Sequence, residues 1–152
     1  MPPRFFSLVL SLSVLLLSAC AGPAPQPDSP EGATSWQLVW QADTGRYNRA
    51  VQQLIRQADD AIGNRNFDKA VTLLERVLRI DNRTASVWSR LGWLALQRQQ
   101  AGRAQNLLMR SNSLNPPPAL EKLNWQLYRE ASTAAGDEAG VARASQKLAA
   151  FD

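Results

Sequence analysis

Apolar residues recur at helical spacing along most of the chain. One stripe follows Thr44, a suitable N-cap, and ends at Gly63, where a C-terminal glycine cap is expected. Its members are Tyr47, Val51, Leu54, Ala58 and Ala61. A second stripe follows Asn66, another suitable cap, and contains Phe67, Ala70, Leu74, Val77 and Leu78. Spacings of three and four residues place each set on one helical face, so the pattern predicts a pair of amphipathic helices.

A second pair of helices is predicted next along the sequence. Thr84 caps a helix that holds Trp88, Leu91, Gly92 and Ala95. Gly102 marks the turn, and the partner helix presents Ala104, Leu107, Leu108 and Leu114 before Pro116, Pro117 and Pro118 stop it. Glycine inside a helix costs about 1 kcal/mol relative to alanine, so Gly92 indicates close packing between two helices.

The two ends of the helical region are less regular. Toward the C-terminus one face contains Leu120, Leu123, Leu127, Ala131 and Ala134, and after a turn at Gly136, capped by Asp137, a last face contains Val141, Ala144, Leu148 and Phe151. Toward the N-terminus, Trp36, Val39 and Trp40 share one side of a short helix. We expect that helix to cover the open end of the first pair; a second membrane contact is the alternative.

The stretch from Trp88 to Pro116 reads W-x-x-L-G-x-x-A, then A-x-x-x-L-x-x-S-x-x-x-x-P. The second half recurs 34 positions earlier as Ala70, Leu74 and Val77. This pattern resembles the tetratricopeptide (TPR) repeat, whose period is 34 residues. The resemblance implies an all-α fold: a short α-solenoid of two clear TPR helix pairs plus a degenerate, lengthened third pair that covers the end.

The first twenty residues are typical of a targeting segment. Arg4 precedes an apolar run from Phe5 to Leu17, 13 residues long, which is too short to span a bilayer and suits a signal peptide. Leu17-Ser18-Ala19-Cys20 resembles the lipobox of bacterial lipoprotein precursors. The resemblance implies cleavage before Cys20 and lipidation, such as palmitate, on that residue. An ordinary signal peptide with a chance cysteine is the alternative.

The predicted division of the sequence follows from these segments. Residues 1–19 are the lipoprotein signal peptide, residues 20–43 are the lipidated N-terminus with a proline-rich tether, and residues 44–152 are the TPR-like helical domain. Ala21 follows the cysteine, and by resemblance to enterobacterial lipoproteins this favours the outer membrane, facing the periplasm, over inner-membrane retention.

Composition excludes several functional classes. The sequence has no histidine, and Cys20 is its single cysteine, so neither a Ser–His nor a Cys–His nucleophile system is available. We therefore expect no enzyme activity, no cofactor and no metal. The net charge is +4, a mild excess without the clustered Lys and Arg of a nucleic-acid binder.

Binding is the remaining class, and the TPR resemblance places ligands on the concave face formed by the first helix of each pair. The candidate residues there are Gln52, Arg56, Asp59, Ser86, Ser89, Arg90, Trp93 and Gln97. Trp93 lies about 140° around the helix from Trp88, so both cannot face one core. Either Trp93 faces the groove, or it packs on a neighbouring helix. Arg56 and Arg90 stand one repeat apart, should be neighbours, and favour an acidic or C-terminal peptide.

Two functions stay open. The first is a membrane-anchored TPR lipoprotein that acts as a protein–protein interaction adaptor or assembly factor in the bacterial envelope, with an envelope protein or peptide as partner. The alternative is an envelope structural protein that contacts lipid headgroups or the cell wall through a basic surface. The stretch from Arg49 to Pro116 has eleven basic and five acidic residues, which is the basis for the second.

Overall fold

The computed structural model describes residues 33–151. The predicted signal peptide, Cys20 and the proline-rich segment up to residue 32 lie outside the described residues. The described part is helical and contains no strand. Its helices are α1 (Ala33–Thr44), α2 (Arg49–Gly63), α3 (Phe67–Ile80), α4 (Ala85–Gln97), α5 (Ala101–Asn112), α6 (Pro118–Ala135) and α7 (Glu138–Leu148), followed by the 3₁₀ helix η1 (Ala149–Phe151).

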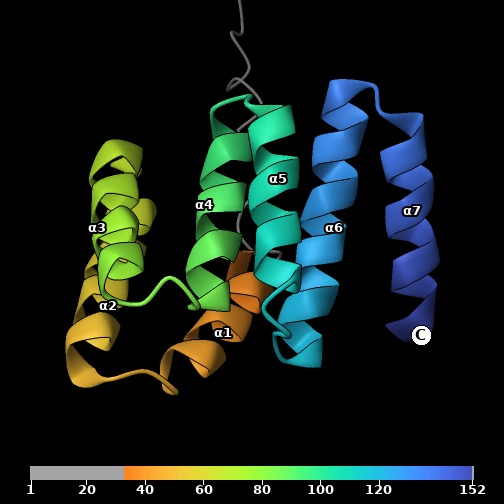
Figure 1. The fold of residues 1–152 in the computed structure, drawn as a ribbon. Coiled ribbons are helices and arrows are strands. Elements are labelled where there is room, and N and C mark those ends of the chain that lie inside the picture. Colours follow the sequence, from red (N-terminus) through yellow and green to blue (C-terminus); the bar gives the residue numbers. More distant parts are fainter. Residues whose placement is uncertain (1–32, 152) are drawn as a thin grey trace, which may run out of the picture.

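The helices α2 to α7 form three successive pairs that stand side by side in a row (Figure 1). The predicted all-α, solenoid-like architecture is confirmed. The third pair is lengthened, as expected: α6 has 18 residues, whereas α4, the first helix of the second pair, has 13.

The N-caps follow the sequence signals in two cases and depart from them in two. Asn66 and Asp137 cap α3 and α7 as predicted, each accepting a bond from a first-turn backbone N–H. The predicted N-cap role of Thr44 is wrong, because Thr44 is the last residue of α1 and Asn48 caps α2 through the Val51 N–H at 3.0 Å. Thr84 stands at the N-cap position of α4, but its hydroxyl donates to the Asp81 carbonyl instead.

The turns inside the first two pairs do not use the predicted glycines. Gly63 is the last residue of α2 and Gly102 lies within α5. The left-handed backbone falls instead on Arg65, with φ 56°, and on Gln99, with φ 59°. These two residues stand 34 positions apart, so the same turn geometry recurs one repeat later without a glycine.

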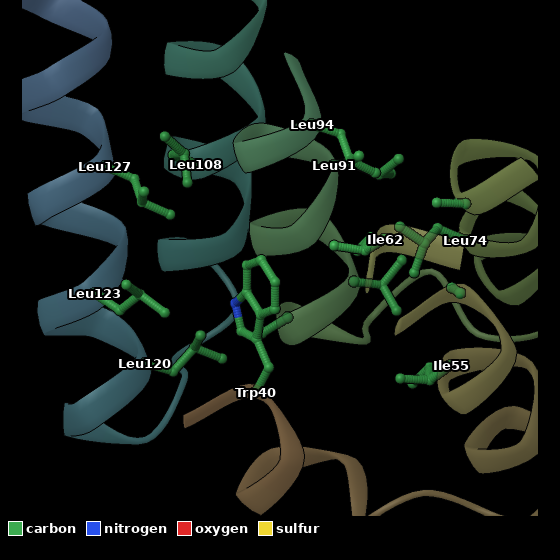
Figure 2. Packing of buried hydrophobic residues seen from close by; sticks show 14 of the residues in the cluster. Trp40, Ile55, Ile62, Leu74, Leu91, Leu94, Leu108, Leu120, Leu123 and Leu127 are labelled. Carbon is green, nitrogen blue, oxygen red and sulfur yellow. The ribbon is translucent and has the colours of Figure 1, made fainter. Parts of the chain in front are cut away.

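One large apolar core runs through all three pairs (Figure 2), and a small second cluster of Ala95, Ala104 and Ala131 accompanies it. Gly92 of α4 is placed where close packing requires it: an added Cβ would lie 2.6 Å from Cγ of Leu108 in α5. The prediction of close α4–α5 packing at Gly92 is confirmed.

Trp88, on the same helix, is only half-buried, and its indole N–H donates to the Asn82 carbonyl at 2.9 Å.

Polar bonds join the second and third pairs inside this core. The buried Ser111 hydroxyl donates to the Ala85 carbonyl at 2.8 Å and accepts from Nδ2 of Asn124 at 2.8 Å. These bonds tie α5 to both α4 and α6. A small residue at position 111 therefore serves both close approach and hydrogen bonding.

The N-terminal helix α1 lies elsewhere than expected. It packs on α4 and α6 and does not cover the open end of the first pair. Trp40 is 1% exposed and points from α1 into the core (Figure 2). Because the large indole of Trp40 fills the space beside α4, α1 packs as part of the helical domain. Residues 36–43, which were assigned to the tether segment, therefore pack with that domain.

Candidate partner-binding site

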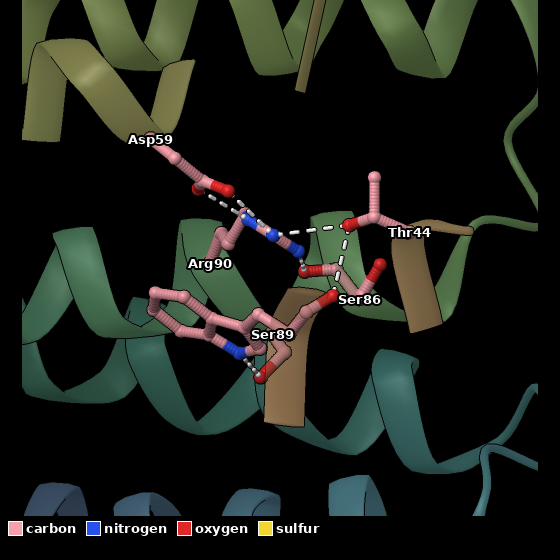
Figure 3. A network of polar contacts seen from close by, with 6 residues as sticks. Thr44, Asp59, Ser86, Ser89 and Arg90 are labelled. Atoms are coloured by element: carbon pink, nitrogen blue, oxygen red, sulfur yellow. Dashed lines mark hydrogen bonds and ion pairs between the residues drawn. The ribbon is translucent and has the colours of Figure 1, made fainter. Parts of the chain in front are cut away.

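An arginine with no solvent exposure lies where α1, α2 and α4 meet. The side chain of Arg90 is 0% exposed, and its Nε and Nη2 donate to the two Asp59 carboxylate oxygens at 2.7 and 2.8 Å. It also donates to the Ser86 carbonyl at 3.2 Å and to the Thr44 hydroxyl at 3.3 Å (Figure 3). A buried charge is tolerated only when it is paired and hydrogen-bonded, and Arg90 meets both conditions.

Trp40 of α1 covers this ion pair. Its indole N–H donates to the Ser89 hydroxyl at 2.9 Å, and the guanidinium carbon of Arg90 lies 5.0 Å from the centroid of its ring. Short serine side chains on this face of α4 leave room for the indole. The hydrogen bond and the cation–π contact hold α1 on α4.

These contacts correct part of the predicted concave site. Ser86, Ser89 and Arg90 were expected to face a ligand, but each is 0% exposed beneath α1. Arg56 is exposed and does not stack with Arg90; its Nη1 donates instead to Oε1 of Gln52 at 3.5 Å. Arg90 cannot stack with Arg56 because Asp59 and α1 together bury its side chain.

Trp93 faces the same side of α4, where it meets other helices of the same molecule. Its ring centroid lies 5.1 Å from that of Trp36, 6.1 Å from that of Trp40 and 5.9 Å from that of Phe67. The aromatic surface expected to hold a partner therefore packs against α1 and α3. Gln97 is exposed at the last position of α4.

Three of the predicted residues do come together at an open cleft beside the α1–α2 connection. The cleft has a volume of about 580 Å³ and is lined by Gln41, Thr44, Gly45, Gln52, Gln53, Arg56, Gln57, Asp59 and Asp60. It therefore contains Gln52, Arg56 and Asp59 but not the predicted residues of α4. The candidate site is this cleft.

The cleft is rich in amides and has two exposed charges. Asp59 is engaged by Arg90, which leaves the exposed Arg56 and Asp60 as its other charged groups. The Gln52 amide donates to the Tyr47 carbonyl at 2.6 Å, which fixes one wall. Glutamine amides offer both donors and acceptors, so the cleft is equipped to hydrogen-bond a peptide and to pair one carboxylate.

Tyr47, in the connection between α1 and α2, is held as a neutral donor. Its hydroxyl donates to Oδ2 of Asp43 at 2.8 Å. Burial, and then the hydrogen bond to Asp43, raise the pKa of the phenol well above its ordinary value. The Tyr47–Asp43 bond therefore persists at neutral pH.

Neither a metal site nor a membrane span is found in the part of the protein that the structure describes. Among these residues no group of three or more His, Cys, Asp or Glu side chains is placed to hold a metal ion. No helix among residues 33–151 has the length and apolar character needed to cross a bilayer.

The sequence reasoning missed the roles of Trp40, Asp43 and Thr44. All three are buried in α1 or at its end. The spacing of Trp36, Val39 and Trp40 was a usable signal, because an amphipathic stripe with two tryptophans needs an apolar surface to pack on. It did not say which surface.

The fold defines a class, namely small all-α, solenoid-like proteins built from stacked helix pairs. No family model matches the sequence, and no curated protein matches it. Among solved structures the protein is similar to the globular C-terminal domain of P. aeruginosa LpoP, with 32% sequence identity and a TM-score of 0.62. The match covers 67% of this chain and 97% of the LpoP domain. The chain belongs to the LpoP family. Its resemblance to TPR repeats stays a prediction.

Proposed function

We propose that the protein is a lipoprotein of the bacterial envelope that recruits a protein partner, as an interaction adaptor or assembly factor. Membership in the LpoP family supports this, together with the lipobox-like Leu17-Ser18-Ala19-Cys20. Lipid on Cys20 anchors it, and Ala21 favours the outer membrane with the helical domain in the periplasm. Several acyl chains on one residue anchor a protein stably.

The observation that carries the proposal is the open cleft beside α1. The partner is a protein segment whose backbone bonds to the glutamine amides, while an acidic side chain or a C-terminal carboxylate pairs with Arg56. Guanidinium and carboxylate form such pairs in a bidentate way. Arg90, Ser86 and Ser89 act beneath this surface: they hold α1 and Asp59 in position and do not touch the partner.

The proposed action is binding rather than catalysis. The sequence has no histidine, and its single cysteine is the proposed lipid attachment site. Catalytic dyads that need a histidine base are therefore not available to it. No cofactor and no nucleic acid enter the proposal.

Capture from envelope extract tests the proposal. The full lipidated protein in a non-ionic detergent is compared with Arg56→Glu and with the control Arg76→Glu, which reverses an exposed charge on α3 away from the cleft. We expect Arg56→Glu to weaken capture of the partner about tenfold, or about 1.4 kcal/mol, and the control to bind normally. Equal loss in both variants would instead favour the surface-charge alternative, because binding through the overall positive charge does not depend on which arginine is reversed. Binding of that kind would also fall steeply with salt.

A further inference from the structure

Another cavity is lined in part by the α1–α2 connection. Its volume is about 260 Å³, and its lining residues are Asp43, Arg46, Tyr47, Arg83, Ala85, Leu114, Asn115, Pro116 and Pro117. They come from three connections, α1–α2, α3–α4 and α5–α6, and from the adjoining ends of α1 and α4; these connections all lie at the lower end of the molecule in Figure 1. No residue lines both this cavity and the cleft of Gln52 and Arg56.

The acidic group of this cavity is already engaged. Asp43 is 3% exposed; its Oδ2 accepts the Tyr47 hydroxyl at 2.8 Å, and its Oδ1 lies 3.6 Å from Nη1 of Arg46. Arg83 is different. It is exposed, and within residues 33–151 its guanidinium has no hydrogen-bond or ion-pair partner. The carboxylate of Asp81 accepts the backbone N–H of Arg83 at 2.9 Å.

The second helix pair provides no carboxylate of its own for Arg83. No acidic residue stands between Asp81 and Glu121. The other arginines on α4 and at its end find carboxylates on the first pair: Arg90 pairs with Asp59 and Arg98 with Asp68. Arg83 thus carries the same guanidinium group as Arg90 and Arg98 but has no carboxylate paired with it among residues 33–151.

We propose that this cavity receives one carboxylate of a partner protein segment, namely the side chain of an acidic residue in that segment. The charged lining residues Asp43, Arg46 and Arg83 sum to one positive charge, which matches a carboxylate. A phosphate monoester carries close to two negative charges at neutral pH and matches less well. Leu114, Pro116 and Pro117 offer apolar contact to the residues that flank the carboxylate. The inference rests on the proposed function in that the partner is an envelope protein.

The test uses two blocked tripeptides, acetyl-Leu-Glu-Leu-amide and the matched acetyl-Leu-Gln-Leu-amide. Each is titrated into the full-length protein in non-ionic detergent, and NMR follows the Arg83 Nε–H and the Ala85 backbone N–H. We expect the Glu peptide to bind about fivefold more tightly than the Gln peptide, as for an exposed ion pair. Arg83→Gln should remove this preference, whereas Arg103→Gln, a control at the opposite end of α5, should retain it.

Equal binding of the two peptides to the wild-type protein overturns the proposal whatever the variants do. So does a preference that survives Arg83→Gln. Inorganic phosphate that shifts the same resonances at lower concentration than the Glu peptide overturns the assignment to a carboxylate. The proposed function fails by a separate result, since it predicts capture of an envelope protein through Arg56 and does not depend on the tripeptides.

Discussion

Asp59→Asn removes the negative charge opposite Arg90 while nearly keeping the size of the side chain. The change leaves a guanidinium that is 0% exposed with neutral acceptors alone: the amide oxygen of the new asparagine, the Ser86 carbonyl and the Thr44 hydroxyl. Arginine keeps its proton in proteins, so the charge stays buried and uncompensated. We therefore expect the folded state to be destabilised.

The magnitude follows from the burial of the two partners. Breaking a buried ion pair by removing one partner costs about 3–5 kcal/mol. The Asp59 side chain is 26% exposed, so water reaches this side of the pair and the cost should lie near the lower limit, at about 3 kcal/mol. A domain of this size has only about 5–15 kcal/mol of stability. If Arg90 were exposed, as the predicted binding site on the concave face requires, Asp59→Asn would cost less than about 1 kcal/mol of stability.

Urea unfolding followed by circular dichroism measures the difference. Asp60→Asn is the matched control, because Asp60 is the next residue on α2, is exposed and forms no salt bridge within residues 33–151. The control should unfold within about 0.5 kcal/mol of the wild type, as for surface changes. A loss at Asp59→Asn as small as in the control would refute the buried network.

Three further predictions concern α1, the lipid anchor and Tyr47. Trp40→Ala should cost about 3–5 kcal/mol, as for large-to-small core changes; an unchanged urea midpoint would mean that α1 is not docked. Cys20→Ser should abolish palmitate labelling and membrane fractionation, and continued labelling would contradict the lipobox prediction. Because the folded-state pKa of Tyr47 is raised, its contribution to stability is full below the ordinary pKa of about 10 and is lost as pH rises above it. Urea unfolding between neutral and alkaline pH should show this loss, and Tyr47→Phe should lessen it.

Much of the fold follows from local pattern. The stripes Val51–Ala58 and Ala70–Val77 sit on helices because their spacing matches the helical period, and Gly92 is explained by its neighbour Leu108. The turns between the helices were harder to predict from the sequence. Left-handed backbone at Arg65 and Gln99 is spanned by backbone hydrogen bonds, from the Asn66 N–H to the Ala61 carbonyl and from the Gln100 N–H to the Ala95 carbonyl, whereas sequence reasoning assigns such positions to glycine.

The candidate site was only partly predictable for a related reason. The burial of Arg90 depends on Asp59, which is 31 positions earlier, and on Trp40, which belongs to another helix. A periodic pattern assigns a residue to a face of its own helix but does not say what covers that face. Gln52 and Arg56 line the open cleft, where Arg56 is exposed and Gln52 is partly buried by its bonds to the Gly45 and Tyr47 carbonyls. Their role in binding stays a prediction.

In-cell photo-crosslinking tests the central claim, that a protein partner binds at the cleft beside α1, most directly. A photo-reactive residue replaces Gln53, which is exposed and lines the cleft, or Arg76, which is exposed on α3 outside it. Illumination of cells that produce the lipidated protein should yield an adduct with an envelope protein at position 53 and little or none at position 76. Adducts at position 76 with none at position 53 would contradict the account.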